Sequence, residues 1–123
     1  MIRGVVNDRN EIRIPLPVLD GAGFEQVIEA ILDTGFDGWL GLPNALISSL
    51  QLLRVAELPV RFGDGRVELI DYYEAKVIWD GVERIVDVRA LDGEILIGMA
   101  LLSGYDLRAR VVIGGSVEIE AIP

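Results

Sequence analysis

Short apolar runs, each rich in Val, Ile and Leu, recur along this chain and are separated by clusters of Gly, Asp and Asn. Runs of roughly five to nine residues between turn residues are typical of β-strands, because an amphipathic helix would place its apolar residues three and four positions apart. With 123 residues, the chain is long enough for one hydrophobic core and too short for two. The sequence therefore predicts a single all-β domain that spans residues 1–123.

Turn residues divide the chain into predicted strands and short helices. The dipeptide Asp80-Gly81 supplies the positive φ angles that a two-residue hairpin requires. Pro43 is suited to the first turn of a helix, where its missing N–H costs no hydrogen bond. We therefore expect hairpins formed by residues 3–6 with 11–19, 57–62 with 66–73, 74–79 with 82–90 and 110–113 with 117–122, a strand over 24–32, a helix over 44–53 and a helix of one or two turns after 95–98.

Two short runs combine apolar residues with a tight turn. The first, Ile31-Leu32-Asp33-Thr34-Gly35-Phe36, delivers a carboxylate from a predicted strand into a Thr-Gly turn. The second, residues 94–102 with the sequence EILIGMALL, lies about sixty residues later and places Gly98 before a predicted short helix. An Asp-Thr-Gly triplet by itself suits an ordinary turn, so the order and spacing of the two runs carry more weight than either alone.

Together the two runs resemble the retropepsin-like (clan AA) aspartic proteases. The resemblance covers nearly the whole chain and is strongest over residues 30–43 and 95–107. It implies an all-β acid-protease fold, in which the chain forms one closed β-barrel half with a flap hairpin and one or two short helices. Because this chain holds a single Asp-Thr-Gly triplet and the family uses two, the resemblance also implies a two-fold homodimer.

Composition narrows the chemistry that the chain can perform. The chain has no cysteine and no histidine, which excludes disulfides, thiolate metal sites, Ser-His and Cys-His triads and HExxH zinc sites. Its one lysine, Lys76, lies in a predicted alternating strand, where a structural role is favoured. Acid-base chemistry therefore falls to carboxylates, and we expect neither a metal ion nor a cofactor.

The resemblance assigns the catalytic roles to the triplet. Two carboxylates at hydrogen-bond distance cannot both ionise, so they share one proton and serve as acid and base together. Asp33 would supply one carboxylate and Asp33 of a second subunit the other. Thr34 would hydrogen-bond across the dyad, and Gly35 would leave room for the backbone of a substrate.

Further residues are expected to contact the substrate. Asp37 lies where the family often has an acidic residue that contacts the substrate backbone or an Arg of the partner, although a turn-capping role is equally compatible with its position. The turn between residues 57–62 and 66–73 occupies the place of the family's flap, whose alternative is an ordinary surface hairpin. The predicted flap residues are Phe62, Gly63, Asp64, Gly65 and Arg66.

The second run is expected to support the Asp-Thr-Gly turn. Gly98, which we include among the substrate-binding residues, would let this run cross close to the turn. Many relatives have Asp or Asn where this chain has Ala100, and viral relatives have Arg where it has Met99. The polar network that braces the catalytic turn in those proteins is therefore missing or replaced here.

Charge and hydropathy indicate the partners of the chain. A net charge of −9 does not favour binding to phosphate backbones, so we expect a peptide or protein substrate and no nucleic acid. No signal peptide and no long apolar span is apparent, so we expect no membrane association and a cytoplasmic location. The apolar residues 111–113 and 117–122 are expected either to pair with a partner strand or to pair within the chain.

Three functions remain at this stage. The first is a homodimeric aspartic endopeptidase that hydrolyses peptide bonds with a water activated by paired Asp33 carboxylates. The second is a catalytically silent peptide-binding or dimerisation module on the same fold. The third is an unrelated β-barrel interaction protein with a coincidental triplet. The intact triplet favours the enzyme, because a binding module has no chemical need for the carboxylate.

Overall fold

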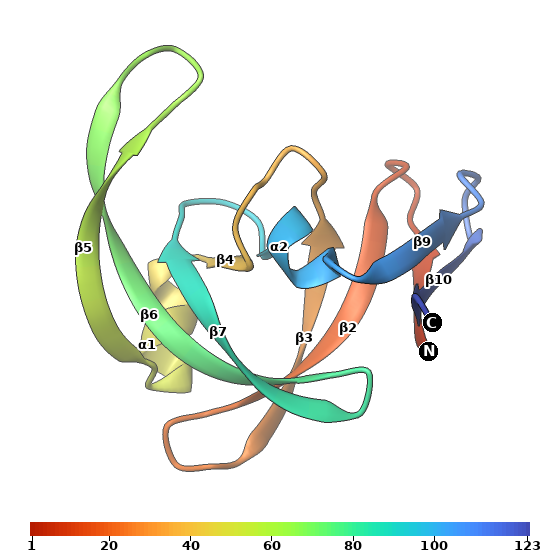
Figure 1. Cartoon of the computed structure of the whole chain (residues 1–123), viewed down its shortest axis with the longest axis horizontal. Helices are drawn as coiled ribbons and strands as arrows, with labels where there is room; N and C mark the ends of the chain where they lie inside the picture. Colours follow the sequence, from red (N-terminus) through yellow and green to blue (C-terminus); the bar gives the residue numbers. More distant parts are fainter.

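The computed structural model describes all residues from 1 to 123 and contains ten strands and two short helices (Figure 1). The all-β prediction is confirmed, and neither helix is long and apolar enough to cross a membrane. In chain order the elements are β1 (Ile2–Val6), β2 (Ile12–Leu19), β3 (Glu25–Leu32), β4 (Leu40–Leu42), α1 (Asn44–Leu50), β5 (Leu53–Arg61), β6 (Val67–Trp79), β7 (Val82–Ala90), β8 (Leu96–Ile97), α2 (Met99–Leu102), β9 (Tyr105–Ala109) and β10 (Ser116–Ala121).

The strands form one sheet that closes on itself. Its order is β5-β6-β7-β4-β8-β3-β2-β1-β10-β9, and an additional pairing of β6 with β2 joins Val18 to Val77 and Leu19 to Lys76. Six strands therefore make a ring, β6-β7-β4-β8-β3-β2. Within it, the pairs β3–β8 and β4–β7 are parallel. Strand β5 continues the sheet beyond the ring on one side, and β1, β10 and β9 continue it on the other.

The hydrophobic core combines side chains from the strands of this ring with others from β1, β10 and both helices. Alternation along β2 buries Ile14, Leu16 and Val18, each at most 1% exposed, as expected for a strand with one face on a core. No polar or charged side chain is buried in the chain. Trp79 is 1% exposed and packs edge-on against Tyr105, with ring centroids 5.9 Å apart. Burying side chains of this size contributes about 1.5–3 kcal/mol each.

Local turn chemistry fixes several chain reversals. At the β6–β7 hairpin, Asp80 and Gly81 both have positive φ, at 53° and 76°, as predicted for a two-residue turn. At the β2–β3 turn, Asp20 Oδ1 accepts hydrogen bonds from the N–H groups of Ala22 and Phe24, both at 2.9 Å. The bond from Phe24 lowers the pKa of Asp20. These turns set the register of the strands that follow them.

The prediction of a strand over residues 110–113 is wrong. Residues 105–109 instead form β9, which pairs with β10 from Val117↔Ala109 to Ala121↔Tyr105. Residues 110–115 make the turn between the two strands, with Arg110 N–H donating to Ser116 O and Gly115 N–H donating to Val112 O. Strand β9 was missed because its sequence, YDLRA, has charged residues at two of its five positions and only its two ends are partly buried. Both terminal strands thus pair within the chain.

Other element boundaries also differ from those expected. The predicted strands 66–73 and 74–79 are a single strand, β6, which is 13 residues long. Helix α1 ends at Leu50 because Gln51 adopts a left-handed conformation with φ of 55°, and Leu53 then begins β5. Strand β4 was not expected, since its three buried residues are too few to give a pattern. It lies between β7 and β8 and completes the ring.

One end of the molecule carries the loops that matter for the site. In Figure 1 the upper end shows the tip of the β5–β6 hairpin, the loop between β3 and β4, and the turn between β9 and β10. The β2–β3 and β6–β7 turns lie at the lower end of the same view. The residues proposed for catalysis and for the flap therefore share one end of the fold.

Candidate active site

The loop between β3 and β4, residues 33–39, is called the Asp loop here. Asp33 follows β3 directly, and its N–H donates to Ile97 O at 2.9 Å. The turn then brings Gly35 N–H to Asp33 Oδ1 at 2.8 Å and Phe36 N–H to Asp33 O at 3.1 Å. Asp33 Oδ2 makes no hydrogen bond, and Thr34 is exposed. One carboxylate oxygen is thus held by the turn while the other is free.

The second run of the sequence supports the Asp loop from behind. The N–H groups of residues 98–100 donate to the loop carbonyls: Gly98 to Trp39 at 3.1 Å, Met99 to Phe36 at 2.8 Å and Ala100 to Gly38 at 3.1 Å. Gly98 is buried, and a Cβ at that position would overlap the carbonyl oxygen of Gly38. The predicted close crossing is confirmed. Because Gly98 lies against the loop backbone, we assign it a structural role.

Arg89 pairs with the Asp loop from the other side. Its Nη1 donates to Asp37 Oδ1 at 2.9 Å, and the Arg89 side chain is 22% exposed while that of Asp37 is 85% exposed. The guanidinium carbon also lies 5.2 Å from the centre of the Phe36 ring and 5.6 Å from that of Tyr72. Asp37 Oδ2 makes no hydrogen bond. Asp37 therefore has an ion-pair partner within its own chain.

Sequence reasoning did not find Arg89. It lies 52 positions after Asp37, within an alternating strand that gave no sign of a site. The pairing depends on β4, whose residue Gly41 lies opposite Arg89 in the parallel pair with β7. The sequence does show a basic residue near the end of a predicted strand. That residue cannot be assigned to the Asp loop until the neighbouring strand, β4, is known. Met99 has no charged group, and the ion pair of this loop is made by Arg89 instead.

The β5–β6 hairpin projects beyond the body of the sheet. Strand β6 pairs with β7 only as far as Tyr72↔Arg89, so residues 57–71 form a ribbon of two strands, called the projecting hairpin here. At its tip Arg66 N–H donates to Asp64 Oδ1 at 2.9 Å, and Gly65 has φ of 87°, which a side chain would disfavour. A ribbon of two strands holds few buried contacts, which is typical of segments that open locally.

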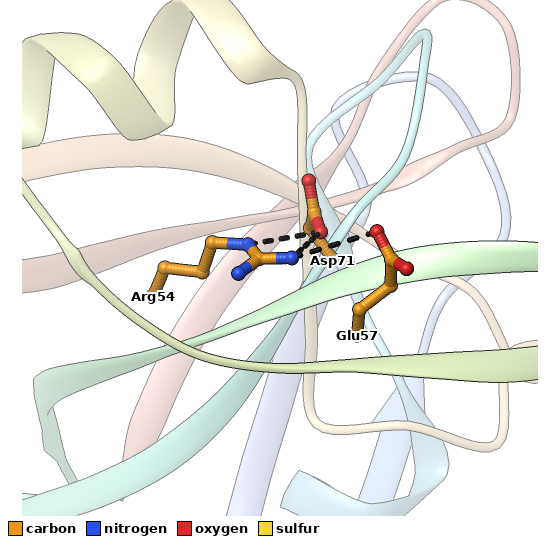
Figure 2. A network of polar contacts seen from close by, with 3 residues as sticks. All are labelled: Arg54, Glu57 and Asp71. Atoms are coloured by element: carbon orange, nitrogen blue, oxygen red, sulfur yellow. Dashed lines mark hydrogen bonds and ion pairs between the residues drawn. The ribbon is translucent and has the colours of Figure 1, made fainter.

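A polar network marks the base of the projecting hairpin (Figure 2). Arg54 Nε and Nη2 donate to Asp71 Oδ1 at 3.0 and 2.8 Å, and Glu57 Oε2 lies 3.5 Å from Nη2. The hydrogen bonds to Asp71 raise the pKa of Arg54, so the guanidinium stays charged. The strand register shifts between Arg54 and Ala56, which indicates a β-bulge. The network therefore joins β5 to β6 where the pairing is irregular.

A pocket of about 580 Å³ lies along the projecting hairpin. Its walls include residues 68–71 of the hairpin, residues 90–92 at the end of β7 and just beyond it, and Asn44 at the start of α1, while none of residues 33–39 takes part. Another pocket of similar volume, about 570 Å³, involves residues 19–21, 51–53 and 74–76 at the opposite end of the fold. The first pocket is the one adjacent to the predicted flap. Neither of these two pockets includes Asp33.

The structure brings some of the predicted site residues together and leaves others apart. Asp33, Thr34, Gly35 and Asp37 share the Asp loop, and Gly98 packs behind it. The predicted flap residues, 62–66, form the tip of the projecting hairpin at the same end of the molecule (Figure 1). No hydrogen bond or ion pair joins this tip to the Asp loop. Phe62 and Arg66 of the tip do line the adjacent pocket.

Comparison of the chain with protein-family models, with curated proteins and with solved structures finds no match in any of the three. A functional assignment therefore depends on the geometry of the Asp loop and of the projecting hairpin.

Proposed function

We propose that this chain is one subunit of a homodimeric aspartic endopeptidase with a retropepsin-like fold. The observation that carries the proposal is how the backbone and the carboxylate of Asp33 are held. Its backbone is fixed to β8, one carboxylate oxygen is held by the Gly35 N–H at 2.8 Å, and the other oxygen is free. A carboxylate fixed in this way at the end of a strand is preorganised to share a proton with a second carboxylate.

The proposed reaction uses two copies of Asp33. Close carboxylates share one proton, so one member of the pair is ionised and the other protonated. The ionised carboxylate takes a proton from water, and the water oxygen forms a bond with the carbonyl carbon of the peptide. The protonated carboxylate donates its proton to the carbonyl oxygen. Collapse of this tetrahedral intermediate breaks the C–N bond. The departing amine takes the proton that the first carboxylate received from water, and the second carboxylate takes a proton back from a hydroxyl of the intermediate, which restores the singly protonated pair.

A second subunit supplies what one chain lacks. The other acidic residue of the loop, Asp37, already accepts a hydrogen bond from Arg89 Nη1 at 2.9 Å. The pocket beside the projecting hairpin stops short of the Asp loop, so a partner is needed to complete a cleft over Asp33. A two-fold axis near Asp33 would place the two free carboxylate oxygens opposite each other. The exposed Thr34 would then lie at the contact between the two Asp loops.

The proposed substrate is an extended peptide segment. It would lie between the Asp loop and the projecting hairpin, which acts as the flap and closes over it. The pocket of about 580 Å³ beside the hairpin is large enough for a side chain of such a peptide. Its walls combine apolar residues such as Leu69 and Leu91 with acidic ones such as Asp92.

The turn between β9 and β10 offers an apolar contact for the second subunit. Val111, Val112 and Ile113 are consecutive and are 61%, 62% and 73% exposed. Large exposed apolar groups next to one another are typical of interaction surfaces. The turn lies at the same end of the fold as the Asp loop (Figure 1), so a dimer through this end would include both.

Ile113→Asp is expected to weaken the dimer by roughly 100-fold or more in Kd, since burial of one isoleucine is worth about 1.5–3 kcal/mol and a buried carboxylate adds a further penalty. The fold should persist, because Ile113 is exposed in the single chain. Analytical ultracentrifugation over a concentration series, combined with activity per chain, measures both effects. The matched control is Val82→Asp in the β6–β7 hairpin, a residue that is 60% exposed. A fully dimeric and active Ile113→Asp variant would contradict this interface.

The function itself is tested by cleavage of a peptide library between acidic and neutral pH, with the Asp33→Asn variant as the control. Cleavage by the wild type that a statine-type transition-state mimic inhibits is the expected result. The alternative function, a catalytically silent peptide-binding module, is favoured by one observation: the pocket beside the hairpin contains no catalytic residue. That alternative predicts binding of library peptides without cleavage at any pH.

A further inference from the structure

Arg89 lies where three parts of the molecule meet. It is near the end of β7, opposite Gly41 of β4 on one side and opposite Tyr72 of β6 on the other. The pair Tyr72↔Arg89 is the last one between β6 and β7, and beyond it the projecting hairpin leaves the sheet. Strand β4 in turn follows directly after the Asp loop. Arg89 therefore stands between the base of the hairpin and the loop that carries Asp33.

The Arg89 side chain contacts both of these parts. It donates to Asp37 Oδ1 at 2.9 Å and lies over Phe36 of the Asp loop at 5.2 Å. The same guanidinium lies 5.6 Å from the ring centre of Tyr72, which belongs to the strand of the hairpin. A planar guanidinium can stack on rings while it donates a hydrogen bond in its own plane, and a lysine ammonium cannot reproduce both contacts.

The contacts of Arg89 are expected to fix the position of the Asp loop more than to stabilise the fold. The Asp37 side chain is 85% exposed, and ion pairs with so exposed a partner contribute little to stability. The backbone of the Asp loop is already held from behind by the N–H groups of residues 98–100. Arg89 forms the only ion pair of the Asp loop, and the same guanidinium lies over the ring of Tyr72 in β6.

We propose that Arg89 is a positioning residue of the catalytic site, which keeps the Asp loop in a fixed relation to the base of the flap. It touches neither the substrate nor the reacting atoms. It acts through Phe36 and Asp37, and it leaves Asp37 Oδ2 free to accept a hydrogen bond from the backbone of a bound peptide. This role rests on the proposed peptidase function. It identifies Arg89 as the residue that links the Asp loop to the flap in this chain.

The test compares Arg89→Ala and Arg89→Lys with the control Arg84→Ala. Arg84 is on the same strand and stacks on Trp39 of the Asp loop at 5.3 Å, but it has no ion pair with the loop. Arg89→Ala should lower kcat/KM by about 10- to 100-fold, the range that a misplaced reacting group produces. Its melting temperature should stay close to that of the wild type. Arg89→Lys should recover part of the loss, and Arg84→Ala should keep kcat/KM within about threefold of the wild type.

A double-mutant cycle shows whether Arg89 acts through Asp37. In the Asp37→Asn background, Arg89→Ala should cause a much smaller further loss of kcat/KM than it does alone, because the two residues share one interaction. If the loss of kcat/KM in the double variant equals the product of the two single losses, Arg89 does not act through Asp37 and the proposal is overturned. Equal losses in Arg84→Ala and Arg89→Ala would also overturn it, since they would indicate general loosening of β7.

A measurement that does not depend on peptidase activity tests the positioning role separately from the proposed function. Amide hydrogen exchange at Phe36, Met99 and Ala100 reports the hydrogen bonds that hold the Asp loop. Exchange at these amides should become about tenfold faster in Arg89→Ala and stay unchanged in Arg84→Ala. Wild type without peptidase activity would contradict the function, whereas unchanged exchange in Arg89→Ala would contradict the positioning role.

Discussion

Asp33→Asn is expected to reduce peptidase activity by at least about a thousandfold, because an amide cannot share a proton with the second carboxylate or accept one from water. The Asn side chain has the same shape, and its carbonyl oxygen can still accept the hydrogen bond from Gly35 N–H. Asp33 is partly exposed, so the substitution leaves no buried group without a partner. The melting temperature and the dimer should therefore stay close to those of the wild type.

The measurement is the initial rate on a cleaved library peptide, at equal dimer concentration and across the full pH range. Asp87→Asn is the matched control, since Asp87 is exposed on β7 and makes no ion pair. The control should retain the wild-type rate. A folded Asp33→Asn dimer that cleaves the peptide as fast as the wild type would show that Asp33 does not perform the chemistry.

Gly98→Ala is expected to destabilise the fold by about 3–5 kcal/mol, which is a large part of the stability of a small domain. The backbone of Gly98, with φ of −99° and ψ of 178°, suits any residue, so the cost is purely steric. A Cβ there would overlap Gly38 O and lie 2.7 Å from the Phe36 ring. The Asp loop would have to move away from β8 and from the hydrogen bonds that hold it.

Urea unfolding followed by circular dichroism measures this loss. The control is Gly63→Ala at the tip of the projecting hairpin, where an added Cβ would meet nothing within 4 Å. The control should unfold within about 0.5 kcal/mol of the wild type. A Gly98→Ala variant as stable as the control would mean that the close crossing of the two runs is not required.

The strands that sequence reasoning found are those whose signals are local. Strand β2 alternates buried and exposed residues, and the Asp80-Gly81 turn requires a conformation that few other dipeptides adopt. The position of Asp33 after β3 could be predicted for the same reason, because the strand, the carboxylate and the turn are consecutive in the chain. Local sequence patterns were sufficient to predict strands and turns whose structure depends on residues adjacent in the chain.

The features that were missed depend on partners distant in sequence. Strand β9 is mostly exposed and is a strand because it pairs with β10, while the consecutive apolar residues 111–113 are left in the turn. Strand β4 has three residues and is defined by its pairing with β7 and β8. The Asp37–Arg89 pair follows from β4 and could not be predicted before it. Tertiary pairing overrode local propensity at each of these places.

The Asp loop is held by two different parts of the chain. Residues 98–100 hold its backbone through hydrogen bonds, so changes there should act on stability. Arg89 holds its exposed side through a solvent-facing ion pair, so changes there should act on turnover. Comparing Gly98→Ala with Arg89→Ala in both assays separates these two kinds of support.

Subunit mixing tests directly whether two copies of Asp33 share one catalytic site. Wild-type and Asp33→Asn chains are mixed in different ratios, allowed to exchange subunits and assayed at constant total concentration. If both carboxylates are required, activity falls with the square of the wild-type fraction, to about one quarter in an equal mixture. Activity that falls in proportion to the wild-type fraction, to about one half in an equal mixture, would show that each chain acts alone and would contradict the shared site.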